Sequence, residues 1–424
     1  MTTKITEQNI SNLANIGVQW QSVFTGDGST GLTAVAGRGY FIDTTSGTVE
    51  VTLPASPSVG DVVVLKDYAR TWNTNNVTLA SALLDAVTTT SEFSTNGQTV
   101  TIVYMDGTKG WSLINEDTTT GLGAVYISAT GGTVTTSGDY KIHTFTGDGC
   151  FVVSCGGNPA GSDTVDYLVV AGGAGGGSSN PGNTAAGGGG GGFRESSGTV
   201  SGCYTVSPLG GCVSALTVSA TTYPISVGGG GAGAPVESSK GGDGSNSVFS
   251  TITSAGGGGG GSNAIRSGVP GGSGGGGSGG DFNQPGGSGN TPPVSPPQGQ
   301  PGGNSAPNPA APPDQSSGGG GGATEAGVNG SSPGTASGRG GAGATTSISG
   351  SPIGYSGGGG GGGSPVPVTI GAASPCGSGS AGASGTPATN ATANRGGGGG
   401  GVGACSSGGA SGGKGIVIIR YKFQ

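Results

Sequence analysis

The sequence predicts an all-β protein, with an N-terminal β-sandwich-like module followed by a glycine-rich domain of packed polyglycine-II helices capped by β-strands. Three observations lead to this prediction. Short runs rich in Val, Ile, Thr and aromatic residues recur between turn residues in residues 21–118. Most of the 104 glycines lie after residue 164, where about one residue in three is glycine. Apolar strand-like segments separate the glycine runs and close the chain.

Residues 1–20 are expected to form an N-terminal attachment segment. They are polar, with weak helical periodicity at Ile5, Ile10, Leu13 and Ile16. Such a segment can pack against a partner or against other copies of itself, and a frayed chain terminus is the alternative. The sequence leaves both readings open.

Residues 21–118 are expected to form the β-sandwich-like module. Alternation supports strands here, because Val49, Val51 and Leu53 share one face of a run whose other face is polar. Residues 105–110 contain two glycines and read as a hairpin connection. The predicted strands are GYFIDTT, TVEVTLP, DVVVLKDYA, NNVTLAS, QTVTIVYM and GWSLI.

Residues 119–164 are expected to form a short β connector, with strands in AVYISA, GTVTT, DYKIHTFT and CFVVSC. The only histidine of the chain, His143, lies in the third of these strands. No cysteine, serine or acid stands at a spacing that suggests a partner for it. We therefore interpret His143 as a satisfied or exposed strand side chain rather than a ligand or a base.

Residues 165–424 are expected to form the glycine-rich domain. Runs of nearly pure glycine recur through it, for example at residues 187–192, 256–261 and 357–363. Extended helices without Cβ atoms can approach one another on every side and exchange backbone hydrogen bonds. A side chain inside a run would push the neighbours apart, so only small residues can interrupt it. Collagen is excluded, because it requires glycine at every third position.

Disorder is the alternative for a segment rich in Gly, Ser and Pro. Two apolar strands argue against it, one at Leu168–Val170 and one in the closing GKGIVIIRYKFQ. A disordered tail would expose the second strand to water, whereas pairing of the two strands would require the intervening chain to fold back and forth. We therefore expect them to pair. The proline-rich residues 291–313 are interpreted as an extended spacer.

Charge and hydropathy exclude several classes of protein. The formal net charge is −7, and no basic stripe of the kind that binds nucleic acid is present. No apolar run is long enough to span a bilayer, so we expect no membrane insertion. The N-terminus lacks the apolar core of a signal peptide. We therefore expect synthesis in a cytoplasm without standard export.

Six cysteines and one histidine do not suggest a metal site or a disulfide framework. Most of the cysteines are interpreted as free small side chains. Cys203 and Cys212 flank a turn sequence and are the best candidates for a pair. Residues 241–248 resemble a calcium β-roll repeat, but Asn246 replaces its aspartate and no tandem copy follows. No cofactor and no metal are expected.

Residues 165–424 resemble the glycine-rich adhesins at the tips of bacteriophage tail fibres. The resemblance is carried by DYLVVAGGAGGG, SVFSTITSAGGGGGG and GGKGIVIIRYKF, and the β module is similar to modules that recur in phage fibre proteins. It implies a sandwich of polyglycine helices whose tip loops contact the host surface. It also implies a homotrimeric virion protein, attached through its N-terminus to other tail or fibre proteins. The expected partner of the tip is an outer-membrane protein or a surface polysaccharide.

Linkers without strand-like segments are expected to turn at the tip, namely residues 178–186, 235–240, 262–270 and parts of 364–395. Phe282 and Tyr355 are read as equally able to cover the edge of the bundle or to stack on a sugar. The candidate receptor-binding residues are Asn180, Asn183, Glu237, Lys240, Asn263, Ile265, Arg266, Asn390 and Arg395.

Three functional hypotheses follow. The first is a non-enzymatic tail-fibre adhesin that binds a receptor on the host cell. The second is a fibre or virion decoration protein without a receptor of its own. The third is a surface-polysaccharide hydrolase, which is disfavoured because no paired carboxylates or nucleophile–base pair stand out in the sequence.

Overall fold

The structure is a computed structural model that describes residues 17–114, 124–180, 182–202, 204–235, 238–279, 283–306, 315–332, 335–364, 368–403 and 408–424. β-strands are the only regular secondary structure in these ranges, which confirms the all-β prediction. None of the described segments is a helix of the length and hydropathy needed to cross a membrane. The attachment segment predicted for residues 1–20 falls largely outside the described residues.

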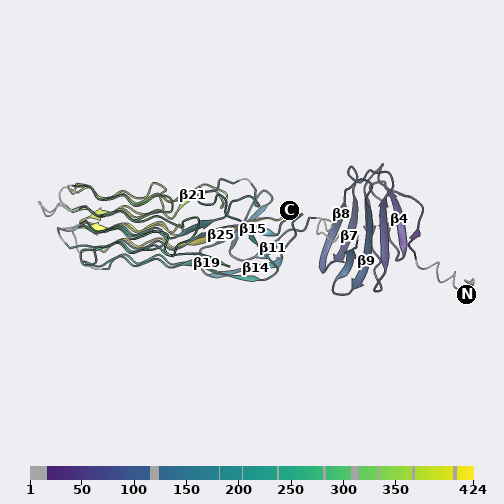
Figure 1. Ribbon diagram of the computed structural model, residues 1–424, viewed down its shortest axis with the longest axis horizontal. Coiled ribbons are helices and arrows are strands. Elements are labelled where there is room, and N and C mark those ends of the chain that lie inside the picture. Colours follow the sequence, from purple (N-terminus) through teal and green to yellow (C-terminus); the bar gives the residue numbers. More distant parts are fainter. Residues whose placement is uncertain are drawn as a thin grey trace, which may run out of the picture. The chain divides into compact units, whose positions relative to one another are not determined.

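The chain divides into two compact units, Met1–Tyr126 with Gly157–Ser162, and Ile127–Gly156 with Asp163–Gln424. The first unit contains the predicted β module (Figure 1). Its strands are β1 Gln19–Trp20, β2 Phe24–Thr25, β3 Leu32–Thr33, β4 Arg38–Asp43, β5 Val49–Thr52, β6 Val62–Asp67, β7 Val77–Leu84, β8 Val87–Phe93, β9 Thr99–Asp106 and β10 Gly110–Leu113.

The strands of the first unit alternate between two halves of one hydrogen-bonded sheet. β2, β4 and β6 pair in parallel in one half, and β3, β5 and β7 pair in parallel in the other. The chain therefore crosses from one half to the other after each strand from β2 to β6, whereas β7 is followed by β8 in the same half. The β9–β10 hairpin and β7 connect the halves. The hairpin connection at residues 105–110 was expected from its glycines. Strand β8 was not predicted.

The core of this unit lies between the two halves. Tyr40 and Ile42 of β4 meet Val49 and Val51 of β5 in a single apolar cluster, which also contains the fully buried Trp72. The predicted alternation is confirmed, because Val49 and Val51 are buried while Glu50 and Thr52 are exposed.

The second unit begins with strands rather than with glycine. The structure differs here from the expected separate connector, because strands from residues 128–155 pair with strands of the glycine-rich domain. The strands of this unit are β11 Ser128–Thr130, β12 Thr133–Ser137, β13 Tyr140–Phe145, β14 Gly149–Cys155, β15 Thr164–Val170, β16 Phe193–Glu195, β17 Leu216–Thr217, β18 Thr222–Ser226, β19 Ser247–Phe249, β20 Ile252–Ser254, β21 Ala344–Thr346, β22 Ile353–Tyr355, β23 Ala383–Ser384, β24 Val402–Gly403 and β25 Ile416–Lys422.

Two sheets, β12-β13-β25-β15-β16 and β11-β14-β18-β19-β20, cover one end of the glycine segments and are here called the strand cap. Strand β25 is the central strand of the first. It lies between β13 and β15 in a sheet of order β12-β13-β25-β15-β16. Leu168 is aligned with Ile418 and Val170 with Ile416, so the predicted pairing of the two apolar strands is confirmed. A second sheet, of order β11-β14-β18-β19-β20, packs on one face of the first through Phe151, Phe249 and other apolar residues.

His143 lies inside this cap and is fully buried. Its Nδ1 is 2.8 Å from the carbonyl oxygen of Gly131, and its Nε2 is 3.1 Å from the Tyr421 hydroxyl. Burial lowers the pKa of the imidazole. His143 is thus a satisfied structural side chain, in agreement with its interpretation from the sequence.

Extended glycine segments run side by side away from the strand cap (Figure 1). The first of them, residues 171–178, continues directly from β15 and donates hydrogen bonds to a different neighbour at each successive residue. The pattern returns to the same neighbour every third residue, the repeat of an extended helix with three residues per turn. The three series run from Ala171, Ala174 and Gly177 to Gly192, Gly189 and Ala186, from Gly172, Gly175 and Ser178 to Ser245, Gly242 and Ser239, and from Gly173 and Gly176 to Gly413 and Ala410.

Close approach of these backbones explains why the runs are glycine. A Cβ on Gly320 would overlap the carbonyl oxygen of Gly188, and a Cβ on Gly358 would overlap that of Gly320. The clashing atoms belong to the backbone, so a side-chain rotation cannot relieve them. Residues 187–192 and 318–322 are buried although they have no side chains to bury, because neighbouring backbones surround them.

A buried polar network joins the two central strands of the cap, β15 and β25, to the loop that follows β16. Asp166 in β15 is fully buried and accepts hydrogen bonds from the Ser196 hydroxyl and from the amides of Gly198 and Ser201. Arg420 in β25 is aligned with Asp166, is 4% exposed, and donates from Nε to the Ser201 carbonyl. These contacts hold the loop after β16 against the two central strands.

Glu195 extends this network toward β21. Its carboxylate accepts hydrogen bonds from the Ser207 amide and the Thr346 hydroxyl, and the residue is 2% exposed. Burial raises the pKa of the carboxyl, although these hydrogen bonds act against the shift.

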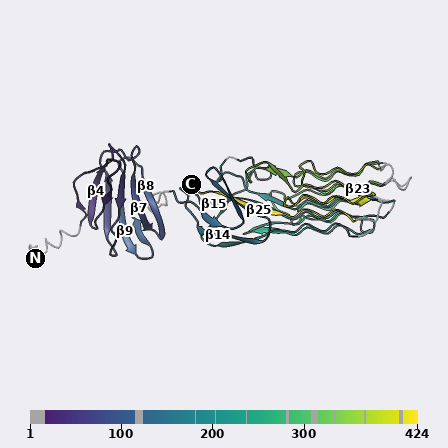
Figure 2. The ribbon, with the colours of Figure 1, turned by 180° about the vertical axis from the view of Figure 1, so that it is seen from behind.

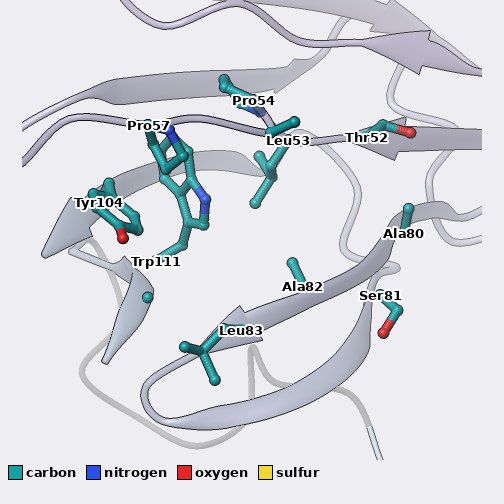
Figure 3. A pocket seen from close by; sticks show the side chains of 12 residues that line it. Thr52, Leu53, Pro54, Pro57, Ala80, Ser81, Ala82, Leu83, Tyr104 and Trp111 are labelled. Atoms are coloured by element: carbon teal, nitrogen blue, oxygen red, sulfur yellow. The ribbon is translucent and has the colours of Figure 1, made fainter. Parts of the chain in front are cut away.

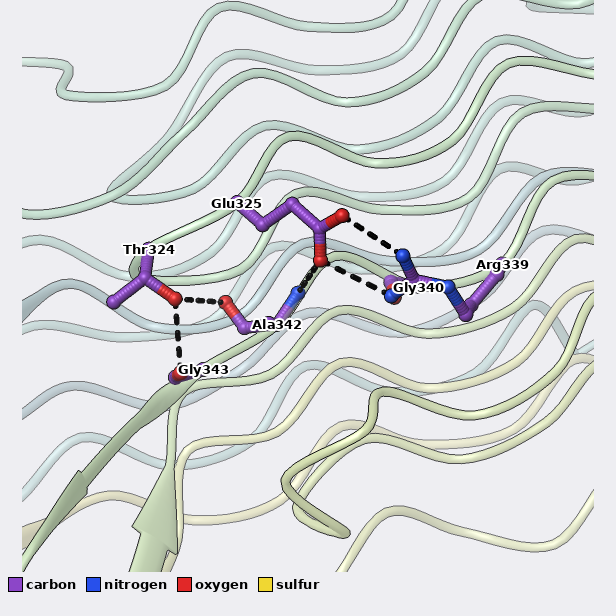
Figure 4. A network of polar contacts seen from close by, with 6 residues as sticks. All are labelled: Thr324, Glu325, Arg339, Gly340, Ala342 and Gly343. Atoms are coloured by element: carbon purple, nitrogen blue, oxygen red, sulfur yellow. Dashed lines mark hydrogen bonds and ion pairs between the residues drawn. The ribbon is translucent and has the colours of Figure 1, made fainter.

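One turn near β21 is closed by an ion pair (Figure 4). Both carboxylate oxygens of Glu325 accept from the Arg339 guanidinium, at 2.8 and 3.1 Å, and one also accepts from the Ala342 amide at 3.1 Å. The hydrogen bonds from Arg339 lower the pKa of Glu325. Both side chains are partly exposed, so the pair fixes the geometry of the turn more than it adds to stability.

We predict that Gly320→Ala destabilises the glycine-rich unit by roughly 1–3 kcal/mol, because the new methyl group overlaps backbone that cannot move aside. The matched control is Gly229→Ala, since a Cβ at Gly229 would meet nothing within 4 Å. Denaturant unfolding of the full chain measures both. Equal effects of the two substitutions would contradict the close-packing explanation.

The raised pKa of Glu195 predicts a pH-dependent contribution to stability. Because the folded state holds the proton more tightly, the contribution is present below the ordinary pKa of Glu and is lost as pH rises through the raised value. Relative to Glu195→Gln, the wild-type unfolding free energy should fall over that window by about 1.4 kcal/mol per unit of the shift. Unfolding at a series of pH values tests this, and parallel pH profiles for the two proteins would show the explanation to be wrong.

Candidate functional site

The candidate site lies where the glycine segments end away from the strand cap, here called the distal end (Figure 2, near β23). The chain reverses there between successive segments. Among the described residues, the β-type pairings between neighbouring segments here are short, namely the parallel β23–β24 pair and the isolated bridges Ser178–Val402, Ala306–Ser316 and Ala336–Thr369. Side chains that would be excluded from the packed segments can therefore project at this end.

Three asparagines join two of the distal loops. The Asn180 Oδ1 accepts hydrogen bonds from the Asn183 amide group at 2.9 Å and from the Asn263 amide group at 3.2 Å. Residues 180 and 263 are far apart in the sequence, so the packed segments between them create this contact. The structure thus brings together three of the predicted site residues.

Ile265 and Arg266 stand next to this asparagine cluster. A tight turn forms as the Ser262 amide donates to the Ile265 carbonyl at 2.8 Å and the Ile265 amide donates to the Ser262 hydroxyl at 3.1 Å. The turn leaves the Ile265 side chain 54% exposed. Arg266 donates from Nε to the Asn263 carbonyl at 3.3 Å. An apolar side chain, a guanidinium and several amide groups are therefore offered together on one surface.

Lys240 lies on the neighbouring loop. The Ser178 amide donates to the Ser239 carbonyl, which places this loop beside the loop that carries Asn180. Lys240 forms an ion pair of 3.7 Å with Asp243, and both side chains are substantially exposed, so the pair contributes little. Glu237, the remaining candidate on this loop, lies outside the described residues.

Two candidate residues do not reach the distal end, and the expectation for them is corrected. The Arg395 carbonyl accepts a hydrogen bond from the Ser356 amide just after β22, so Arg395 lies beside the strand cap. Asn390 accepts from the Ser411 amide along the side of a glycine segment. The expectation placed parts of residues 364–395 at the tip, with Asn390 and Arg395 among the candidates there. The chain instead returns to the cap within this range, because residues 391–395 lead down to the start of the run at 396–401.

The sequence left open whether Phe282 and Tyr355 cover the edge of the bundle or stack on a sugar. Tyr355 is 1% exposed and packs in the apolar cluster of the cap, so it is not a stacking platform. Phe282 lies outside the described residues. Part of the proline-rich stretch, predicted to be a spacer, belongs to the packed segments, since the Gly303 amide donates to the Gly319 carbonyl.

A groove near the distal end was missed from the sequence. It has a volume of about 430 Å³, and no charged residue lines it. Its polar side chains are Ser384, Thr386 and Thr389, which lie within residues 364–395 but were not among the candidate site residues. The full lining is Ile370, Ala381, Gly382, Ala383, Ser384, Thr386, Pro387, Ala388 and Thr389.

The described residues hold no group of three or more His, Cys, Asp or Glu side chains that could bind a metal ion. Cys150, Cys155, Cys212 and Cys376 are free thiols. The suggested pair of Cys203 with Cys212 cannot be placed, because Cys203 lies outside the described residues.

A family model described as a glycine-rich domain matches residues 153–422. The match begins within β14 and ends at the last residue of β25, so it covers the glycine segments together with most of their strand cap. A comparison with curated proteins finds none that matches the chain.

We predict that Asn180→Ala loosens the distal loops without unfolding the domain, because it removes the acceptor that joins them. Amides in residues 178–184 and 262–266 should exchange hydrogen faster, while global stability should change by about 1 kcal/mol or less. Asn390→Ala is the control, since Asn390 bonds to Ser411 instead. Unchanged exchange in both loops would mean that the asparagine contacts do not order this end.

Proposed function

The chain belongs to the glycine-rich domain family, and on this premise we propose that it is a non-enzymatic adhesin of a bacteriophage tail fibre. In this proposal the glycine-rich unit binds a receptor on the host cell through its distal loops. The N-terminal part attaches the protein to other tail or fibre proteins, in a homotrimeric assembly on the virion. The receptor is an outer-membrane protein or a surface polysaccharide.

The observation that carries the proposal is that large side chains are rare in the packed glycine segments and gather on the loops at their distal end. Packed backbone excludes side chains from the segments, whereas Asn180, Asn263, Ile265 and Arg266 gather on adjoining loops at the distal end. A rigid support that presents variable loops at one end is a common arrangement for recognition. The asparagine and arginine groups can hydrogen-bond to a receptor, and exposed Ile265 can bury apolar area.

We further propose that the glycine segments are polyglycine-II helices. The three-residue period of the hydrogen bonds donated by residues 171–178 supports this assignment. Such helices would give the support its stiffness, because each segment is bonded to several neighbours and not only to two, as in a sheet. Stiff support lowers the entropy that the distal loops lose when they bind.

We predict that Arg266→Ala weakens binding of the full chain to susceptible bacterial cells about tenfold or more, the loss expected for a central interface arginine. Arg395→Ala is the matched control, because Arg395 has similar partial exposure but lies beside the strand cap. The measurement is cell binding of the labelled protein across a panel of strains, together with its ability to block phage adsorption.

The outcomes separate the candidate functions. Failure of the intact protein to bind any susceptible strain would favour a decoration protein and contradict the proposal. A fall in polysaccharide viscosity on incubation with the protein would identify a hydrolase. Equal losses for both arginine substitutions would place the binding surface away from the distal loops.

A further inference from the structure

The ten-stranded sheet of the N-terminal unit has a gap along one edge of β7. On its other edge β7 pairs with β8. On the edge with the gap, β5 is aligned with Val77–Leu79 and β10 with Leu84 alone. Within residues 17–114, no strand is aligned with residues 80–83 on this edge. The pairing of β7 with β8 shifts register between Leu79 and Ala82, so the gap coincides with an irregularity in the strand.

A cavity of about 400 Å³ occupies this gap (Figure 3). The segment that follows β5 forms one wall, with Leu53, Pro54 and Pro57, and residues 80–83 of β7 form the opposite wall. Tyr104 of β9 and Trp111 of β10 lie at one end of it. The size is sufficient for one or two sugar rings or for a few residues of peptide.

The rings at the end of the cavity are held in a defined arrangement. The centroids of Tyr104 and Trp111 are 5.5 Å apart, with an angle of 64° between the ring planes. Trp111 is 4% exposed and fixed, whereas Tyr104 is partly exposed. Gly110 permits this arrangement, because it has a φ of 74° and a Cβ there would overlap the Leu83 carbonyl. Tyr104 is therefore an aromatic surface that a ligand can reach, supported from behind by Trp111.

The polar groups of the cavity are neutral. Thr52 and Ser81 are exposed, and no Asp, Glu, Lys or Arg lines the cavity. A charged ligand would lose hydration here without gaining a partner of opposite charge. The lining instead suits a neutral molecule with both apolar faces and hydroxyl groups.

From these observations we infer that the cavity between β5 and β10 binds a neutral carbohydrate, one or two sugar rings in size. The C–H face of a ring would lie against Tyr104, and its hydroxyl groups would bond to Thr52, Ser81 and the backbone edge of residues 80–83. This site lies in the N-terminal unit. It is independent of the distal loops and of the receptor that they are proposed to bind.

An extended peptide is the competing occupant, because an open strand edge can accept another strand. The geometry favours the sugar. The open edge is only four residues long, and β5 and β10 close it at both ends. A strand added there could not continue past either end, whereas a compact ring fits within these limits.

The test uses the full chain and saturation-transfer NMR. The probes are glucose, galactose, N-acetylglucosamine and their β-linked disaccharides, with glucuronic acid as the charged comparison and an uncharged Thr–Val hexapeptide as the competing ligand. We expect at least one neutral sugar to bind with millimolar affinity and glucuronic acid to bind more weakly. Tyr104→Ala should weaken the sugar about tenfold through loss of the ring contact.

Two further variants keep the result interpretable. Ser81→Val removes an exposed hydroxyl with little risk to folding and should weaken binding several-fold. Tyr68→Ala removes a tyrosine that is 58% exposed in the same unit but outside the cavity, and it should leave binding unchanged. Three results would overturn the inference: no neutral sugar binds, the hexapeptide binds in preference, or the sugar binds equally to Tyr104→Ala and wild type.

Discussion

The glycine-rich unit depends on hydrogen bonds between backbones that carry no side chains. Glycine loses more conformational entropy on folding than any other residue, so long runs are unfavourable unless their amides and carbonyls find partners. In residues 171–178 the partners come from three neighbouring segments in rotation. This arrangement requires close approach on several sides at once, which a Cβ at positions such as Gly320 would prevent. The composition of the domain is therefore a direct consequence of how it satisfies its backbone.

The packed glycine segments have few large apolar side chains of their own, and the strand cap supplies the buried apolar core of the unit. β15 leads into the first glycine segment and β25 follows the last, and their pairing fixes both ends of the domain in one sheet. The apolar clusters on the two faces of that sheet provide the hydrophobic stabilisation. Asp166, Glu195 and Arg420, all buried and hydrogen-bonded, fix how the loops between strands are seated. Leaving any of these groups without a partner would cost more than the bond itself contributes.

The strand cap, the glycine segments and the distal loops constrain their side chains differently. Residues at the strand cap are constrained by packing, and residues inside the segments are constrained to be small. The distal loops are the part of the unit where amide, charged and apolar side chains can vary, and this is why we propose them as the recognition surface. The N-terminal unit differs in kind, since it has an ordinary side-chain core and a neutral cavity at a gap in its sheet.

Sequence alone was sufficient wherever a local pattern carried the information. The alternation in β5, the glycine-containing β9–β10 connection, the pairing of the two apolar strands and the structural role of His143 could all be read from it. Glycine runs predicted close packing because the absence of side chains is itself the local signal. Only the tertiary structure decided which neighbours each run contacts, since runs of identical composition carry no register. For this reason the sequence placed Arg395 at the wrong end of the unit and could not pair Asn180 with Asn263. The gap beside β7 could not be predicted either, because it depends on where β5 ends and where β10 begins.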